Sequence, residues 1–395
     1  MAEYVHEAAR ASRHAAFPRW LLLLLIGGVV GYALPLVIPS DSAFQQALAD
    51  GPALLLGCLW ILPLLIIVHE GGHLVAAWLV EFSFHYCIVG PLKIIRTRQG
   101  VRVRLSKEHL LSGAVLCYPL DDRRLRLRLA IVSAAGPLAN FALAAVAWRL
   151  WSFYSVVCCT DFTRPPWTVD SLAVLALLSL ETGVANLIPF PTQRGASDGL
   201  HIFRVLSGGR AGEREVLAHQ MARYILGGAR PREWPGALVL RQVALAETPQ
   251  QVHGASIVAY SWALDTGDSA GAGMFLDRAL ATIPTPSKPH PALALEAAYF
   301  AARYRSNLPL ARAWLAYGKG TQFEPVMRPR AEMAMLLVEG RCEEALMRAT
   351  QGLAACELLA PKTMSGLQTE AEDLRAMAAE AHARSAWASA QQAII

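Results

Sequence analysis

Apolar residues are concentrated in long runs in the first half of the chain. As a helix, a run of about 20 apolar residues can cross a hydrocarbon core about 30 Å thick. Four runs are long enough, or nearly so: residues 20–38, 52–80, 129–150 and 170–190. No such run follows after about residue 205. The pattern predicts a short segment at 1–18, a bundle of about four membrane helices within 19–205, and a soluble domain at 206–395.

The first run has an alternative interpretation as a signal peptide, because Arg10, Arg13 and Arg19 precede it. Its apolar stretch is longer than the core of a typical signal peptide, and no clear small-residue cleavage site follows it. An uncleaved membrane anchor is therefore the favoured interpretation.

The second half of the chain has a repeating pattern in which a turn is followed five residues later by an alanine. The pairs are Gly267 and Ala272, Ser306 and Ala311, and Gly340 and Ala345. The turns are 39 and 34 residues apart, and amphipathic segments rich in Ala and Leu flank them. The pattern resembles tetratricopeptide repeats, which are helix pairs of about 34 residues stacked into a solenoid. An ordinary helical bundle is the alternative, and both interpretations make the fold mostly α.

The segment between the second and third runs, which contains the loop at 83–127, is strongly basic. Its basic residues are Lys93, Arg96, Arg98, Arg102, Arg104, Lys107, Arg123, Arg124, Arg126 and Arg128. The connections on the opposite side of the predicted membrane helices carry almost no Lys or Arg. The positive-inside rule therefore places the basic loop and the C-terminal domain in the cytoplasm.

Apolar and basic residues alternate around Gln99-Gly100, which predicts a β-hairpin within the basic loop, at Leu92 to Ser106. Two interpretations of this hairpin remain open. An edge strand could pair with an extended substrate, or the basic side chains could contact anionic lipid headgroups. Because this loop explains the net charge of +5, we expect the lipid bilayer and no nucleic acid among the partners.

Three ionisable residues, His69, Glu70 and His73, interrupt the second apolar run. Ionisable groups at membrane depth are rare and usually functional. Residues four apart lie on one face of a helix, so His69 and His73 can direct two imidazole nitrogens at one Zn2+ ion. Glu70 lies beside that point, where it can take a proton from water. If the histidines were only core residues of a soluble helix, a glutamate on a helix apolar on every face would stay unexplained.

A catalytic zinc site usually has a third protein ligand. The seven cysteines contain no C-x-x-C pair, so we expect this ligand to be a carboxylate or a histidine. Asp198 follows the Pro-broken end of the fourth run on the cytoplasmic side, and it is the predicted ligand. Two alternatives stay open: Ser197 and Asp198 could cap the next helix, or His201 could be the ligand instead.

Three segments, in this order, resemble the site-2 protease family of intramembrane zinc metalloproteases. They are HEGGH at 69–73, AGPLAN at 135–140, and NLIPFP at 186–191 followed by Asp198-Gly199. The resemblance covers about residues 52–205. It implies that His69, His73 and Asp198 hold zinc and that Glu70 is the catalytic base.

The same resemblance implies that Asn140 and Asn186 are accessory polar groups that contact substrate backbone or water. One departure concerns the approach to the third ligand. The family spacing between the Asn and the ligand Asp is tight, whereas here the extra residues TQRGAS lie between Pro191 and Asp198. We expect them to form a loop that returns Asp198 to the metal.

The resemblance implies an enzyme that hydrolyses peptide bonds within or near transmembrane segments of membrane-protein substrates, as in regulated intramembrane proteolysis. We expect a multi-pass protein of the bacterial inner membrane, with a helical C-terminal domain that recruits the substrate or a protein partner. The alternative is a non-catalytic membrane scaffold that binds proteins through the helical-repeat domain. The intact set of His69, Glu70 and His73 favours the enzyme, because a scaffold has no need of a base in the membrane.

Overall fold

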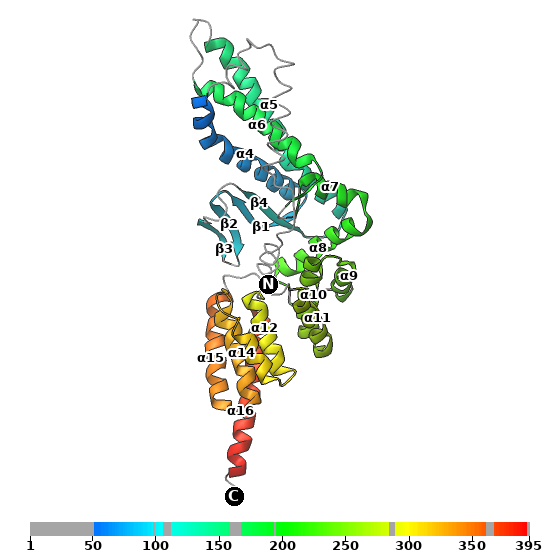
Figure 1. Cartoon of the computed structure of the whole chain (residues 1–395), viewed down its shortest axis with the longest axis vertical. Coiled ribbons are helices and arrows are strands. Elements are labelled where there is room, and N and C mark those ends of the chain that lie inside the picture. Colours follow the sequence, from blue (N-terminus) through cyan, green and yellow to red (C-terminus); the bar gives the residue numbers. More distant parts are fainter. Residues whose placement is uncertain are drawn as a thin grey trace. The chain divides into compact units, whose positions relative to one another are not determined.

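The computed structural model describes residues 51–97, 99–105, 112–158, 167–192, 195–283, 289–360 and 367–392. Helices dominate these residues, which confirms the mostly α fold (Figure 1). The chain forms two compact units. The first contains the described residues of Arg13–Arg96 and Val101–Gln220, and the second contains those from Met221 onward together with the described residues of Thr97–Gly100. The expected segment at 1–18 and the expected membrane helix at 20–38 lie outside the described residues.

Three helices of the first unit lie in the region of the later apolar runs: α4 (Gly51–Leu79), α5 (Leu125–Cys158) and α6 (Trp167–Leu187). The stretches Trp60–Leu79 and Leu125–Val157 are long and apolar enough to cross a membrane. The apolar stretch of helix α6, Ser171–Leu187, is shorter than these two. Large apolar side chains remain exposed along α4 and α5, and a lipid environment would cover them.

Small residues let these helices approach one another closely. A side chain at Gly72 of α4 would meet the backbone carbonyl of Ala135 in α5. A side chain at Gly183 of α6 would meet the ring of Phe141 in α5. Glycine is favoured at such contacts because it allows two membrane helices to pack backbone against backbone. The packing places the HEGGH segment of α4 beside the AGPLAN segment of α5.

The basic loop folds into a four-stranded sheet, which is larger than the single hairpin expected. Its strands are β1 (Phe82–Val89), β2 (Leu92–Thr97), β3 (Gly100–Leu105) and β4 (Gly113–Pro119). The strand order is β3-β2-β1-β4, and β1 pairs antiparallel with both β2 and β4. The predicted hairpin is β2–β3. The other two strands were not predicted. The sequence of β4, GAVLCYP, lacks the alternation of apolar and polar residues that marks a half-buried strand, and that of β1, FSFHYCIV, shows it only over its first five residues.

After α6, the chain makes a short two-stranded hairpin, β5 (Pro191–Thr192) and β6 (Gly195–Ala196). It then enters α7 (Asp198–Ser207) and α8 (Gly209–Gly227). The hairpin accommodates the extra residues of the TQRGAS segment, so the chain returns at Ser197, whose backbone N–H donates to the carbonyl of Phe190.

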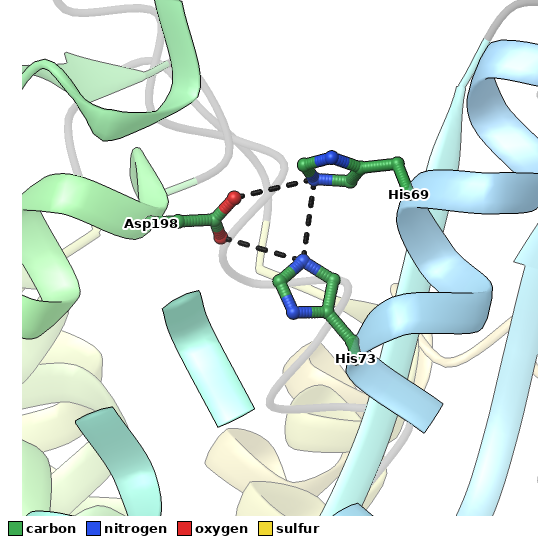
Figure 2. Close-up of side chains that lie close together, drawn as sticks. All are labelled: His69, His73 and Asp198. Carbon is green, nitrogen blue, oxygen red and sulfur yellow. Dashed lines mark hydrogen bonds and ion pairs between the residues drawn. The ribbon is translucent and has the colours of Figure 1, made fainter. Parts of the chain in front are cut away.

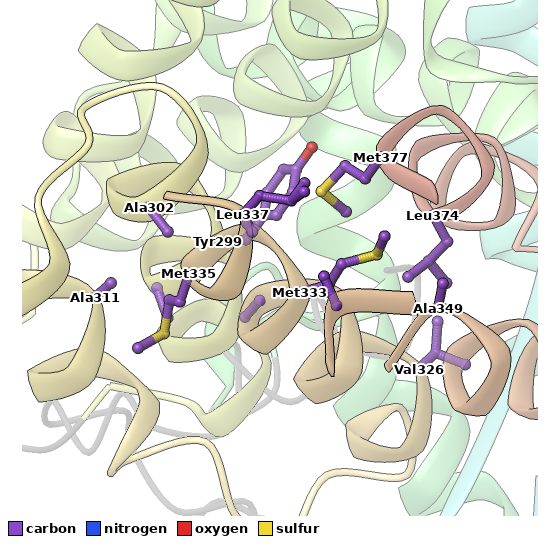
Figure 3. Close-up of a cluster of buried hydrophobic side chains, with 14 of the residues drawn as sticks. Tyr299, Ala302, Ala311, Val326, Met333, Met335, Leu337, Ala349, Leu374 and Met377 are labelled. Atoms are coloured by element: carbon purple, nitrogen blue, oxygen red, sulfur yellow. The ribbon is translucent and has the colours of Figure 1, made fainter. Parts of the chain in front are cut away.

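The second unit is helical. Its elements are η3 (Pro231–Glu233), α9 (Gly236–Leu245), α10 (Pro249–Asp265), α11 (Ser269–Ala281), α12 (Pro291–Arg303), α13 (Leu308–Leu315), α14 (Glu324–Val338), α15 (Cys342–Leu359) and α16 (Gln368–Gln392). Buried side chains of α12, α14, α15 and α16, including Met333, Leu374 and Met377, form one core cluster (Figure 3).

The three expected turns each join two helices. Gly267 lies between α10 and α11, Ser306 between α12 and α13, and Gly340 between α14 and α15, all with positive φ. The alanines five residues after these turns are fully buried. Each helix pair therefore has a small side chain near its turn, where the chain is buried. Ser306 adopts a left-handed backbone conformation, in which asparagine or glycine is more common than serine. Helix pairs therefore occur where the repeat pattern was read, and their assignment as tetratricopeptide-like repeats stays a prediction.

Candidate metal centre

Helix α4 places His69 and His73 one turn apart with their rings facing the same point. The two ring centroids are 4.8 Å apart, with the rings edge to face, and the two Nε2 atoms are 3.2 Å apart. Residues i and i+4 share a helix face, which explains the convergence. Glu70, the next residue after His69, is buried on the same helix.

Asp198 approaches this pair from the start of α7 (Figure 2). Its Oδ2 atom lies 3.2 Å from Nε2 of His69, and its Oδ1 atom lies 3.6 Å from Nε2 of His73. Both imidazole side chains are 12% exposed and the Asp198 side chain is 17% exposed. The structure therefore brings together the three residues predicted to hold zinc.

The helix cap of α7 comes from Ser197 rather than from Asp198. The Ser197 hydroxyl accepts a hydrogen bond from the backbone N–H of Leu200 and donates one to the carbonyl of Ile188. The carboxylate of Asp198 is thereby left to face the histidines. His201, the alternative ligand, pairs instead with Glu215 of α8.

The donor set fits a tetrahedral zinc ion. Ligand atoms about 2.0–2.1 Å from zinc are separated from one another by about 3.3–3.4 Å in a tetrahedron. The separations of Nε2 of His69 from Nε2 of His73 and from Oδ2 of Asp198, both 3.2 Å, lie close to that value, and the other carboxylate oxygen lies 3.6 Å from Nε2 of His73. One donor atom from each of the three residues lies within 4.8 Å of the other two. Without a metal, burial alone would raise the pKa of Asp198, but hydrogen bonds donated by imidazole N–H groups outweigh it and lower this pKa below its usual range. A bound metal would take the place of these protons. An ionised carboxylate and two imidazoles are typical zinc ligands.

Hydrogen bonds behind the rings orient the histidines. Nδ1 of His73 lies 2.7 Å from the backbone carbonyl of Val132, so this nitrogen carries the proton and Nε2 keeps its lone pair. The side-chain amide nitrogen of the fully buried Asn140 lies 3.2 Å from Nδ1 of His69, and its amide oxygen has no hydrogen-bond partner. A carboxamide can present either its oxygen or its nitrogen, and with the oxygen towards the ring it accepts the proton of His69 Nδ1 and leaves Nε2 as the donor to a metal.

The two predicted accessory residues lie in different surroundings. Asn140 is behind His69, so it is placed to orient a ligand. The side chain of Asn186 donates a hydrogen bond to the backbone carbonyl of Thr182 within α6. The role of Asn186 in contacting substrate stays a prediction.

Two glycines at the site were not predicted from the sequence. A side chain at Gly136 would fall on the rings of both His69 and His73, so the glycine of AGPLAN leaves the space that they occupy. A side chain at Gly113, the first residue of β4, would fall on the carboxylate of Glu70. The glycine of AGPLAN was visible as part of a motif, whereas nothing in the sequence around Gly113 marks its approach to Glu70.

A buried glutamate beside two imidazoles and a carboxylate, on helices apolar enough to cross a membrane, defines the class as membrane metallopeptidase. The family model of Peptidase family M50 matches residues 57–169 of the chain. This match confirms the resemblance to the site-2 protease family over α4, the sheet and α5, and for these residues it supports a membrane metalloprotease of that kind at the level of the family. No curated protein and no solved structure matches the chain.

Proposed function

We propose that the protein is an intramembrane zinc endopeptidase that hydrolyses peptide bonds within or near transmembrane segments of other membrane proteins. The observation that carries the proposal is the convergence of His69, His73 and Asp198 next to Glu70 on an apolar helix. A scaffold without catalytic activity would not need a buried carboxylate beside a set of metal ligands.

In this proposal His69, His73 and Asp198 hold zinc, which would supply a Lewis acid that activates water and polarises the scissile carbonyl. Glu70 accepts the proton of the attacking water and passes it to the leaving amine nitrogen. The hydrogen bonds from His73 to Val132 and between His69 and Asn140 keep each Nε2 directed at the same point. The apolar surroundings of α4 and α5 limit the access of bulk water.

A substrate helix must unwind before its peptide bonds can be attacked, because helical carbonyls are already hydrogen-bonded. We propose that β4 holds the unwound segment by β-augmentation. Among the described strands, β4 pairs only with β1, so its other edge can accept a strand. The start of β4 at Gly113 lies against Glu70, which would bring a paired substrate to the base.

The basic hairpin β2–β3 is better suited to the other interpretation, contact with lipid headgroups. It lies at the sheet edge opposite to β4. Strand β3 exposes apolar side chains, with Val101 and Val103 each 63% exposed, between its arginines. Alternating apolar and basic side chains can enter the interface of an anionic membrane.

For the second unit, we propose recruitment of the substrate or of a protein partner in the cytoplasm, with the protein in the bacterial inner membrane. The basic loop supports this orientation by the positive-inside rule. A reporter fused at the C-terminus should therefore be accessible from the cytoplasm. An external signal would contradict the orientation and leave the site chemistry unaffected.

The function is tested with the full chain in proteoliposomes together with a single-span substrate carrying helix-breaking residues. We expect zinc-dependent cleavage by the wild type, and no cleavage by Glu70→Gln at the same zinc content. Equal cleavage by both proteins would contradict the proposal.

A further inference from the structure

Asp198, the proposed zinc ligand, is carried by a short helix that packs mainly against α5. Helix α7 has ten residues, of which Gly199 and Val205 are buried. Val205 belongs to a core cluster that includes Ala77 of α4 and Leu129 of α5. This anchors one face of α7 but leaves its rotation to be restrained by other contacts.

Helix α8 supplies a second contact through Glu215. Its carboxylate pairs with the imidazole of His201 through one oxygen, and its other oxygen lies 4.0 Å from the guanidinium of Arg204. The Glu215 side chain is 11% exposed, and its backbone carbonyl lies 2.9 Å from Nδ1 of the His219 ring. Glu215 is therefore itself held in place.

The positions of His201 and Arg204 around α7 show that their contact with Glu215 restrains the rotation of α7 about its own axis. At about 100° per residue, His201 and Arg204 lie about 60° and 120° to one side of Asp198, whereas Val205 lies within about 20° of it. A rotation of α7 by about 20° would move a carboxylate about 5–6 Å from the helix axis by about 2 Å. A metal ligand has to be held to within about 0.5 Å. Contacts on the flank of α7 therefore determine whether Asp198 reaches the metal.

We propose that Glu215 is a positioning residue for Asp198, which holds α7 in register with α4 through His201 and Arg204. The inference rests on the proposed function, since it assumes that Asp198 is a zinc ligand. It gives His201 a role that differs from metal ligation, and it links metal affinity to a carboxylate that does not touch the metal.

The test is a titration of the metal-free full chain in detergent with Co²⁺, followed by the absorption bands of tetrahedral cobalt. Glu215→Ala should weaken cobalt binding by about 10–100-fold, as expected when a group that orients a ligand is lost. Glu215→Gln, which keeps an acceptor oxygen for His201, should recover part of that loss. The matched control is Glu213→Ala, which removes the same charge from the same helix and should leave binding within about twofold.

Asp198→Ala is the reference that separates the two hypotheses. Wild-type cobalt binding by Glu215→Ala, combined with a large loss in Asp198→Ala, would overturn the positioning role and leave the proposed function intact. Wild-type binding by both variants would overturn the proposed function. Should Glu215→Ala fail to fold, His201→Gln provides the same comparison, and unchanged cobalt affinity in that variant would overturn the positioning role.

Discussion

In each unit of the molecule, side chains from several helices form a cluster of polar groups that is largely buried, and the metal centre of the first unit differs in charge from the cluster around Arg330 in the second. In the first unit, His69, His73 and Asp198 converge on one point. In the second, the guanidinium of Arg330, 3% exposed, lies between Glu296 and Asp373 at 2.9 and 2.7 Å.

The cluster in the second unit contains its own cation. Arg330 stacks over the ring of Tyr299 with 3.7 Å from its guanidinium carbon to the centroid, and Tyr260 donates a hydrogen bond of 2.7 Å to Glu296. These residues come from the first helices of three consecutive helix pairs: Tyr260 lies on α10, Glu296 on α12 and Arg330 on α14. The cluster thus has a cation of its own between its carboxylates, and it needs no added metal, although Nε of Arg330 has no hydrogen-bond partner.

The cluster in the first unit consists of groups that all offer lone pairs. Two neutral imidazole nitrogens and a carboxylate gain little from facing one another at 3.2–3.6 Å unless a cation or proton lies between them. The comparison suggests that a buried cluster made only of donors to a metal marks a binding site, whereas a cluster with its own guanidinium stabilises the fold. Changes to the two clusters should therefore have separable effects.

The largest effect is expected for Glu70→Gln, because this change removes the proton acceptor and keeps the shape of the side chain. Cleavage of a transmembrane substrate should fall by about 10²–10⁴-fold, while zinc content and the stability of the second unit stay unchanged. Glu81→Gln, in the exposed turn after α4, is the control and should retain wild-type activity. Loss of zinc from Glu70→Gln would show that Glu70 has a structural role at the site.

The next effect concerns the second cluster alone. Arg330→Ala leaves the largely buried Glu296 and the partly exposed Asp373 without their cation and should destabilise the second unit by about 3 kcal/mol, the lower end for a broken buried pair. Native-state hydrogen exchange of α14 in the full chain measures this change. Arg375→Ala, at an exposed position of α16, should stay within about 0.5 kcal/mol of the wild type. A change in zinc affinity in Arg330→Ala would contradict the separation of the two clusters.

Removal of zinc with a chelator should act on the first cluster alone. At a free zinc concentration of about 100 times Kd, bound metal stabilises the folded state by about 2.7 kcal/mol. Chelation should therefore increase hydrogen exchange in α7 and in the HEGGH segment, with no change in α14. Equal increases in both units would indicate that the metal stabilises the chain as a whole.

A smaller effect is expected for Gly136→Ala, whose methyl group would occupy the space of the two imidazoles. Zinc affinity should fall by at least about tenfold, because a displaced imidazole no longer points at the shared site. Gly71→Ala is the control, since a side chain at that position meets nothing within 4 Å. Unchanged affinity in both variants would show that the imidazoles can move without loss of the site.

The part of the site that lies on α4 could be predicted from the sequence because it depends only on the local geometry of one helix. His69 and His73 follow the spacing of one helical turn, and the apolar runs locate α4 and α5. The approach of Asp198 could be expected from its place after the Pro-broken end of the fourth run and from the order of the motifs, but not its geometry, which depends on the β5–β6 hairpin and on the cap made by Ser197. The contacts of Gly113 with Glu70 and of Val132 with His73 could not be predicted, because they join segments far apart in the chain without any pattern of their own.

In the second unit, too, local features could be predicted from the sequence and contacts between distant segments could not. Turns at Gly267, Ser306 and Gly340 could be read from residue types and spacing, since each depends on a few neighbouring residues. The pairing of Arg330 with Glu296 and Asp373 could not, because charged residues on amphipathic helices are usually solvated. Burial of a charge follows from how whole helices pack, which a single sequence does not show.

The central claim is that His69, His73 and Asp198 hold one zinc ion, and it is tested most directly by the metal content of the purified full chain. The wild type should contain about one zinc per chain, and His69→Ala and Asp198→Ala should each lose most of it, because two remaining ligands bind zinc weakly. His201→Ala should still take up zinc when the metal is in excess. Full zinc content in both His69→Ala and Asp198→Ala would contradict the account.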